Sequence, residues 1–216
     1  MTPAPSSGRL AALARDILDR AAGRRRFLVA IAGAPGSGKS TLAERLLAAL
    51  EAASPGAASL VPMDGFHLDN AILDARGLRA RKGSPETFDV EGLAALLARV
   101  RAGGRAVAAP VFDRDLDLAR AGARVIEPGQ PVVLVEGNYL LLRDPPWDAL
   151  ASLFDRTLFV EAPEDELARR LVARWLHHGL DLAAARARAE RNDLPNARLV
   201  VSRSRPADVV WPTGDD

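Results

Sequence analysis

Cysteine is absent from the 216-residue chain, which excludes disulfides, thiol catalysis and cysteine metal sites. Three histidines leave few ligands for a histidine-based zinc site. The chain has no excess of one charge sign: 29 Lys and Arg face 28 Asp and Glu, a formal charge of +1. This balance argues against a dedicated binder of nucleic acid or of an anionic membrane. There is no uncharged apolar run of about 18 residues, and the N-terminal sequence MTPAPSSGRL has no signal-peptide core. The sequence therefore predicts no membrane span and a cytoplasmic protein.

Lysine is scarce as well. Lys39 and Lys82 are the two lysines among 29 basic residues, and all the others are arginine. The lysine ammonium is compact and mobile, whereas the arginine guanidinium is a planar fork. A lysine in this Arg-rich chain therefore indicates a position that needs an ammonium group. For Lys82, chance in an Arg-rich chain stays open as the alternative.

The length and the 48% hydrophobic content suit one compact domain, residues 1–216. Short apolar runs typical of buried parallel strands alternate with helical patterns. Strands are expected near 27–31, 58–63, 132–135, 157–160 and 207–211, with an edge hairpin at 107–112 and 124–126. Helices are expected at 9–22, 41–52, 91–101, 163–178, 181–191 and 196–204, and a further helix is expected to be capped by residues 144–146 and to run to about residue 154. This alternation predicts an α/β fold with a central, mostly parallel sheet and helices on both faces.

A polar segment interrupted by glycine and proline separates two of these units. It spans residues 64–90 and contains one short helical pattern at 70–75. We expect this segment to face a substrate.

The most specific motif follows the first expected strand. The sequence GAPGSGKST at 33–41 matches G-x-x-x-x-G-K-[ST] in full, between a strand and a helix. Glycines let successive backbone N–H groups point into one concavity, and the helix N-terminus favours an anion there. Lys39 is expected to reach the β- and γ-phosphates of a nucleotide, and Ser40 to offer its hydroxyl to Mg²⁺. The expected nucleotide-binding residues are Gly33, Ala34, Pro35, Gly36, Ser37, Gly38, Lys39, Ser40 and Thr41.

A phosphate-binding loop does not by itself define a reaction. The chain has no Asn-Lys-x-Asp motif for guanine and no LSGGQ-like signature of transporter ATPases. The polar segment 64–90 can instead supply a pocket for a second substrate, which favours a small-molecule kinase. A nucleotide-hydrolysing or nucleotide-binding regulatory protein without a small acceptor stays open as the alternative.

Two acidic residues follow expected strands near this loop. Asp64 comes after the second strand, which we expect to lie beside the strand that leads into the loop, where ligands bind in open α/β sheets. Its carboxylate can accept the proton of an attacking hydroxyl. Glu136 ends a buried strand and can bind Mg²⁺ directly or through water. A helix-capping role for Asp64 and a buried structural role for Glu136 are the alternatives.

Arg170 and Arg174 lie four residues apart on the expected helix 163–178 and share a face. We expect them to stabilise the charge of the transferring phosphoryl group from a helical lid, about residues 170–195, that closes over the site. A solvated helix face is the alternative for Arg174.

Together these motifs resemble a known enzyme family. The phosphate-binding loop is followed in order by DGFH at 64–67, RKGSPETFD at 81–89, APVFD at 109–113, VEGNY at 135–139 and APED at 162–165. The chain resembles the P-loop kinases of the uridine kinase, phosphoribulokinase and bacterial pantothenate kinase superfamily. It is most similar to the nucleoside/nucleotide kinase-like proteins labelled fructose transport system kinases. The resemblance covers residues 27–211.

The resemblance implies a P-loop NTPase three-layer fold with a small helical lid, ATP as co-substrate, Mg²⁺ and a small-molecule acceptor. It leaves a homodimer open, because relatives often pair. Matched by position, Asp64 is the catalytic aspartate, Glu136 the acidic residue near the metal and Arg174 the lid arginine. By the same matching, the acceptor is expected to contact Asp64, His67, Lys82, Tyr139 and Asn192.

One motif departs from the pantothenate kinases. Where those have Tyr-Ser-His, this chain has Phe112-Asp113-Arg114, which changes the shape and charge of the pocket. Arg114 can meet an anionic acceptor such as a sugar phosphate or a carboxylate. An ion pair with Asp113, Asp115 or Asp117 is the alternative.

The sequence thus predicts an ATP- and Mg²⁺-dependent kinase that phosphorylates a hydroxyl of a sugar, a nucleoside or a pantothenate-like alcohol. The expected catalytic residues are Lys39, Asp64, Arg170 and Arg174.

Overall fold

The computed structural model describes residues 6–214, so both ends of the expected 1–216 domain lie outside the described residues. Its main sheet has five parallel strands in the order β2-β5-β1-β6-β7. These strands are β1 (Phe27–Gly33), β2 (Ala58–Pro62), β5 (Val132–Gly137), β6 (Arg156–Glu161) and β7 (Val209–Pro212). The helices are α1 (Ser6–Ala21), α2 (Lys39–Ala53), α3 (Asn70–Ala75), α4 (Val90–Ala102), α5 (Glu164–His177), α6 (Leu182–Arg188) and α7 (Leu194–Arg203).

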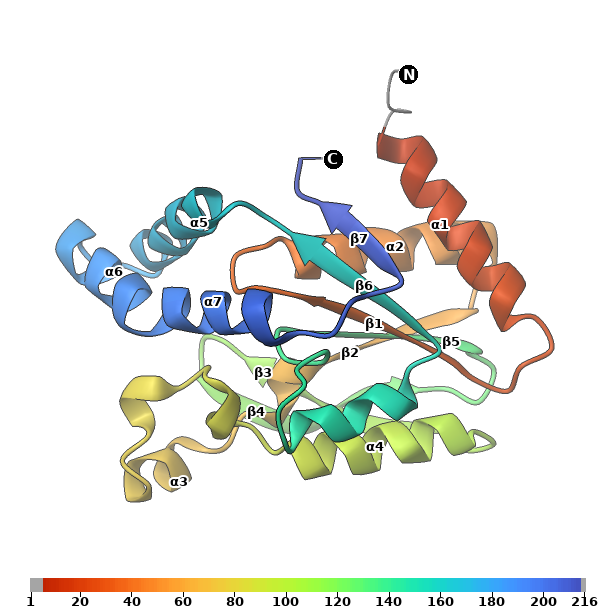
Figure 1. Cartoon of the computed structure of the whole chain (residues 1–216). Coiled ribbons are helices and arrows are strands. Elements are labelled where there is room, and N and C mark those ends of the chain that lie inside the picture. Colours follow the sequence, from red (N-terminus) through yellow and green to blue (C-terminus); the bar gives the residue numbers. More distant parts are fainter. Residues whose placement is uncertain (1–5, 215–216) are drawn as a thin grey trace.

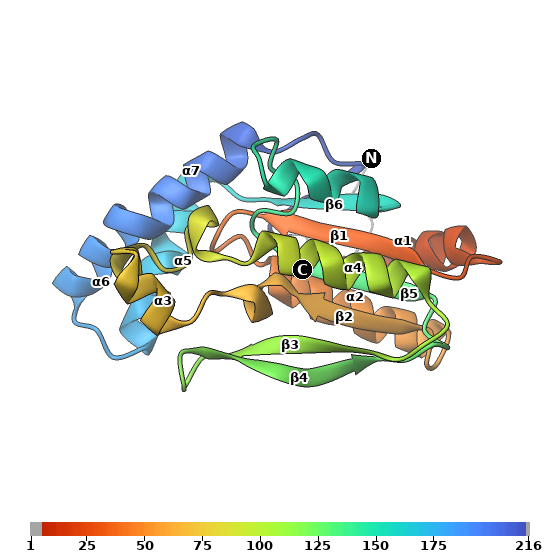
Figure 2. The ribbon, with the colours of Figure 1, turned by 90° about the horizontal axis from the view of Figure 1, so that it is seen from below.

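Helices cover both faces of this sheet (Figures 1 and 2). Every residue of β1 is buried, and its side chains alternate between two apolar cores. Leu28 packs into the core that contains α4, whereas Val29 packs into the core that contains α1 and α2. This division confirms the expected three-layer α/β fold, because a parallel strand in such a sheet must be apolar on both sides.

One expectation about the sheet is wrong. The strand before Asp64, β2, does not lie beside β1, because β5 is inserted between them. Val132 of β5 is in register with Phe27 on one side and with Ala58 on the other. The carboxyl end of β5, with Glu136, therefore lies between the phosphate-binding loop and Asp64.

The expected edge hairpin is also placed differently. β3 (Val107–Asp113) and β4 (Leu118–Ile126) pair antiparallel with each other and form a separate two-stranded sheet. This hairpin packs against the 3₁₀ helix Met63–Phe66, which follows β2. Figure 2 shows the hairpin along one side of the molecule, next to β2. The hairpin thus brings its turn to the residues around Asp64.

The helix expected after the cap at 144–146 lies where it was predicted. It spans Trp147–Leu153, with Pro146 as its N-cap residue, but it is a 3₁₀ helix rather than an α-helix. A cis peptide bond joins Pro145 to Pro146.

Helices α5, α6 and α7 gather at one end of the sheet (Figure 1). The two helices expected at 181–191 and 196–204 are joined: α6 continues through a π-helical turn, Ala189–Asp193, into α7. Within residues 6–214, no helix is both long and apolar enough to cross a bilayer.

Candidate active site

The glycine-rich loop connects β1 to α2. Gly36 and Gly38 have φ angles of 82° and 89°, in the left-handed region that favours glycine. Gly38 is the N-cap of α2, and Lys39 is the first residue of that 15-residue helix. The loop thus presents backbone N–H groups together with a helix N-terminus, which is the arrangement that binds phosphate.

Three predicted residues meet beside this loop. The Nζ atom of Lys39 lies 3.6 Å from Oε1 of Glu136, and both side chains are close to fully buried. Burial raises the pKa of Glu136, and the positive charge of Lys39 opposes this rise. The Ser40 hydroxyl also favours the ionised form of the Glu136 carboxyl group, which acts to lower its pKa. The structure therefore brings together the ammonium, hydroxyl and carboxyl groups that the sequence assigns to phosphate and metal.

The oxygen atoms of Ser40 and Glu136 fit a magnesium ion. Mg²⁺ prefers hard oxygen ligands and is commonly held by one or two protein oxygens together with substrate phosphates. Within residues 6–214, no group of three or more His, Asp or Glu side chains is arranged to hold a metal alone. This donor set therefore suits a magnesium ion that arrives with a nucleotide.

Asp64 lies in the 3₁₀ helix after β2, and its carboxylate is paired. Nη2 of Arg114 donates to Oδ2 of Asp64 at 2.9 Å. The negative charge of Asp64 contributes to the raised pKa of Glu136, so the two carboxyl groups share one electrostatic environment. The sequence-based alternative, in which Arg114 pairs with an aspartate of its own turn, is not what the structure shows.

His67 supports the turn that carries Asp64. Its Nδ1 atom lies 2.8 Å from the backbone oxygen of Asp64, and its ring packs against Phe88 and Phe112, at centroid distances of 4.1 Å and 4.5 Å. Burial lowers the pKa of His67, so the ring is neutral near pH 7. A neutral ring with Nδ1–H can donate to the Asp64 carbonyl and keep Nε2 as an acceptor.

The ammonium group of Lys82 is fully engaged within the protein. It donates to Oδ1 of Asn70 at 2.7 Å, to the backbone oxygen of Asp117 at 2.8 Å and to Oδ1 of Asp117 at 2.7 Å. The Lys82 side chain is 9% exposed and also lies over the ring of Phe112. Lys82 thus ties the segment 64–90 to the turn of the β3–β4 hairpin. From the sequence, Lys82 is expected to face the acceptor. Its partners Asn70 and Asp117 belong to no recognisable motif, so the sequence did not identify them.

Tyr139 and Asn192 hold the backbone next to Lys82. Tyr139 is completely buried, and its hydroxyl donates to the carbonyl of Gly83 at 2.5 Å. Burial raises the pKa of Tyr139, which keeps its proton in place for this bond. Nδ2 of Asn192 donates to the carbonyl of Lys82 at 3.1 Å. Both residues thus position the segment that carries Lys82, and their expected contact with the acceptor stays a prediction.

The two lid arginines differ in their surroundings. Nη1 of Arg170 lies 3.4 Å from the carbonyl oxygens of Gly36 and Ser37, and its Nε donates to Glu166. Nη2 of Arg174 pairs with Asp193 at 3.3 Å, away from the loop contacts that Arg170 makes. Arg170 therefore lies directly against the phosphate-binding loop. Its partner Glu166 is detectable from sequence only as an i, i+4 pair.

A cavity of about 290 Å³ adjoins the loop. It lies between the loop, Arg170 and the end of β7, and it is lined by Ser37, Gly38, Thr41, Leu42, Val160, Arg170, Trp211, Pro212 and Thr213. Trp211, Pro212 and Thr213 belong to no motif, so the sequence did not identify them as part of this cavity.

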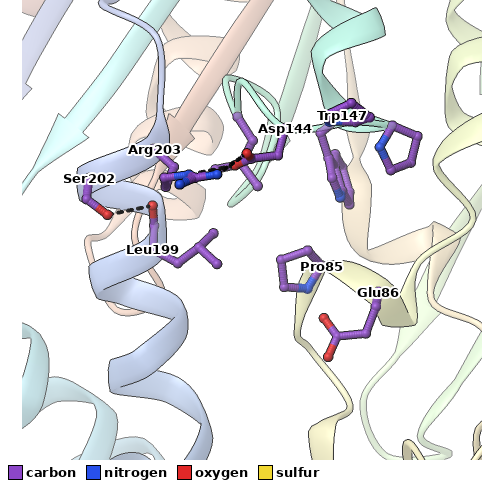
Figure 3. A pocket seen from close by; sticks show the side chains of 10 residues that line it. Pro85, Glu86, Asp144, Trp147, Leu199, Ser202 and Arg203 are labelled. Carbon is purple, nitrogen blue, oxygen red and sulfur yellow. Dashed lines mark hydrogen bonds and ion pairs between the residues drawn. The ribbon is translucent and has the colours of Figure 1, made fainter.

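A larger cavity, about 490 Å³, lies elsewhere and is shown in Figure 3. Pro85 and Glu86 form one side, and Leu199 with the ion pair between Arg203 and Asp144 forms the other. None of the predicted site residues lines it.

A phosphate-binding loop at the end of a parallel strand, with buried Lys39 and Glu136 beside it and Asp64 one strand further, defines the class of P-loop kinases. The chain matches the "Phosphoribulokinase / Uridine kinase family" over residues 28–215. It belongs to this family.

Similar sequences come from bacteria and a yeast. The chain is 40% identical over 190 residues to "Uncharacterized protein YggC" of Escherichia coli K12, covering 87% of this chain and 78% of that protein. It is 32% identical over 169 residues to a pantothenate kinase of Parvibaculum lavamentivorans, covering 74% of this chain but 52% of that enzyme. It is 32% identical over 197 residues to "Putative uridine kinase C227.14" of Schizosaccharomyces pombe, covering 87% of this chain and 83% of that protein.

Solved structures show the same fold. A "putative fructose transport system kinase" from Silicibacter sp. TM1040 superposes with a TM-score of 0.88 at 50% identity, covering 94% of this chain and 98% of that one. YFH7 from Saccharomyces cerevisiae superposes with a TM-score of 0.80 at 20% identity, with the same coverage, and supports the fold alone. The family match, the uridine kinase and pantothenate kinase relatives and the Silicibacter structure support ATP-dependent phosphoryl transfer as the general activity.

Proposed function

We propose that the protein transfers the γ-phosphate of ATP, in the presence of Mg²⁺, to a hydroxyl group of a small metabolite: a sugar, a nucleoside or a pantothenate-like alcohol. One observation carries this proposal. Asp64 lies at the same edge of the sheet as Lys39 and Glu136, separated from the phosphate-binding loop by the single strand β5. The folded segment 64–90 beside this carboxylate provides room for a second substrate, which a protein that only hydrolyses or senses nucleotide does not need.

The nucleotide would bind with its phosphates in the loop and its nucleoside in the 290 Å³ cavity. This cavity opens beside Gly38 and Thr41, directly next to the loop. Arg170, which lies against the loop and lines the cavity, would contact the phosphate chain. When bound by Ser40 and Glu136, Mg²⁺ supplies positive charge to the phosphate oxygens.

The transfer would follow from these positions. Asp64 orients the acceptor hydroxyl and takes its proton while the oxygen forms a bond to the γ-phosphorus. The bond from that phosphorus to the β–γ bridging oxygen breaks, and ADP leaves with the electron pair. Lys39 and Arg170 stabilise the charge on the phosphoryl oxygens.

Residues 170–195 would act as the lid over this reaction. Two hydrogen bonds already link this region to the acceptor segment: Asn192 binds the carbonyl of Lys82, and Arg188 binds the carbonyl of Ala80 at 2.9 Å. Closure would exclude water, which competes with the acceptor for the phosphoryl group. Arg174 would reach the phosphates only if it left Asp193. The cytoplasmic location and a homodimer remain predictions from the sequence.

An ADP-release screen tests this proposal. The purified protein is incubated with ATP and Mg²⁺ and with a panel of sugars, nucleosides and vitamin alcohols. A kinase gives slow ADP release alone and rapid release with its acceptor, and Lys39→Ala removes most of the acceptor-dependent rate. Steady hydrolysis that no acceptor accelerates would instead indicate a regulatory nucleotide-binding protein.

A further inference from the structure

Arg114 is positioned unusually for a surface arginine. It lies in the turn of the β3–β4 hairpin, where Asp113, Asp115 and Asp117 are its nearest acidic neighbours in sequence. Asp113 pairs with Arg120 at 3.1 Å, and Asp117 pairs with Lys82. The Arg114 guanidinium instead reaches Asp64.

The ion pair between Arg114 and Asp64 is partly open to solvent. The Arg114 side chain is 61% exposed and that of Asp64 is 27% exposed. Exposed ion pairs contribute little to folding stability, because water screens the charges and the side chains lose freedom. The pair therefore contributes little to the free energy of folding, and a competing anion can displace Asp64 from Arg114 at a small cost in free energy.

Unlike Lys82, Arg114 has donors to spare. Lys82 lies over the ring of Phe112, which packs against His67, and Arg114 contacts Asp64, so both cations lie near the expected acceptor position. All three N–H groups of Lys82 are used by Asn70 and Asp117. Arg114 has five N–H donors, and a single hydrogen bond, from Nη2 to Asp64, engages them. An anionic group on a ligand would therefore bind to Arg114 rather than to Lys82.

These observations rest on the proposed kinase function and narrow its acceptor. We propose that the acceptor carries a carboxylate or phosphate group in addition to its reacting hydroxyl, and that Arg114 selects it by binding this group. When Arg114 turns to the anion, Asp64 becomes free to accept the hydroxyl proton.

The pair has a consequence for the protein without acceptor. The hydrogen bond from Arg114 occupies Oδ2 of Asp64. This oxygen is therefore less accessible to a water molecule until an anionic acceptor draws Arg114 away. A neutral acceptor has no charged group that can replace Asp64 as the partner of Arg114. To reach Asp64, such an acceptor must break the ion pair without forming a new one.

Matched acceptors separate charge from shape. The kinetic constants of the wild type are measured by ADP release with glycerate and glycerol, pantothenate and pantothenol, fructose 6-phosphate and fructose, and uridine monophosphate and uridine. Acceptors that carry a carboxylate and acceptors that carry a phosphate are compared separately. For the pair that contains the best acceptor, the charged member should have a kcat/KM about 10- to 100-fold higher, the range of a hydrogen bond between charged groups.

Two arginine variants complete the test. Arg114→Gln should lower kcat/KM for the charged acceptor by the same factor, mainly through KM, and should raise ATP hydrolysis in the absence of acceptor. Arg114→Lys keeps the charge and should retain part of the preference. Arg120→Gln, in the same hairpin and ion-paired with Asp113, is the control and should leave the preference unchanged.

The outcomes distinguish this inference from the proposed function. If neutral acceptors are used as well as charged ones and Arg114→Gln changes neither rate, the inference is wrong while the kinase function stands. If no compound of either kind accelerates ADP release, the proposed function itself fails, and the inference with it.

Discussion

The connection between Lys82 and Asp117 allows a quantitative prediction about stability. Lys82→Met removes an ammonium group that makes three hydrogen bonds, at 2.7 Å to 2.8 Å, to Asp117 and Asn70. Asp117 then keeps the hydrogen bonds from Asn70 and the ion pair with Arg79. Hydrogen bonds to charged groups contribute about 1.5–3 kcal/mol when buried. Lys82 is buried, but the Asp117 side chain is 48% exposed, so solvent screening reduces the gain. We expect a coupling free energy of about 1–2 kcal/mol between the two side chains.

A double-mutant cycle measures this coupling. The free energies of unfolding of the wild type, Lys82→Met, Asp117→Asn and the double variant are obtained from urea titrations. Each single variant should also lower Tm by about 2–4 °C per kcal/mol lost, as is typical for a chain of this size. The double variant should lose less stability than the sum of the two single variants. Additivity to within about 0.5 kcal/mol would refute the tie between the hairpin and the acceptor segment.

Three further predictions concern the surroundings of the site. Glu136→Gln should weaken binding of Mg²⁺–ATP but not of magnesium-free ATP, measured by calorimetry; equal loss of both would contradict a metal role. Burial lowers the pKa of His67, so the unfolded chain binds more protons below about pH 6.5. The unfolding free energy should therefore fall as the pH drops below that value, and less so in His67→Asn; identical pH profiles would count against this. Gly65→Ala would place a Cβ 2.4 Å from the carbonyl oxygen of Pro110. It should cost about 1–3 kcal/mol in urea unfolding, whereas Gly129→Ala, with open space around it, should cost little.

Local patterns were sufficient to predict the phosphate-binding loop. Its glycines, Lys39 and Ser40 are contiguous in sequence, so their chemistry does not depend on how distant strands pair. The helix at 70–75 agrees for the same reason: it corresponds to α3, and the side chain of Asp69 accepts from the N–H of Ala71 to cap it.

Strand order could not be predicted in this way. Apolar runs such as 58–63 and 132–135 show that a strand is buried, but they contain no information about which neighbour it pairs with. The insertion of β5 between β1 and β2 is decided by the packing of the whole sheet. The role of the residues at the end of β7 in the cavity beside the loop was missed for the same reason.

The partners of the charged residues were the other limit. Asp64 and Arg114 are 50 positions apart in the chain, and the ion pair forms because the separate hairpin brings its turn to the end of β2. Tyr139 was expected at the acceptor because of its motif, yet its side chain is buried and its hydroxyl serves Gly83. Motifs identify which residue types gather at a site, whereas contacts decide which of them face the ligand.

Phosphoryl transfer by Asp64→Asn, in the presence of the acceptor found by the screen, tests the central claim most directly. The substitution keeps the size of the side chain and removes the proton acceptor. The account predicts that acceptor-dependent ADP release falls by about 10²- to 10⁴-fold, the usual contribution of a general base, while the Kd for ATP stays unchanged. A variant that transfers phosphate at close to the wild-type rate would contradict it.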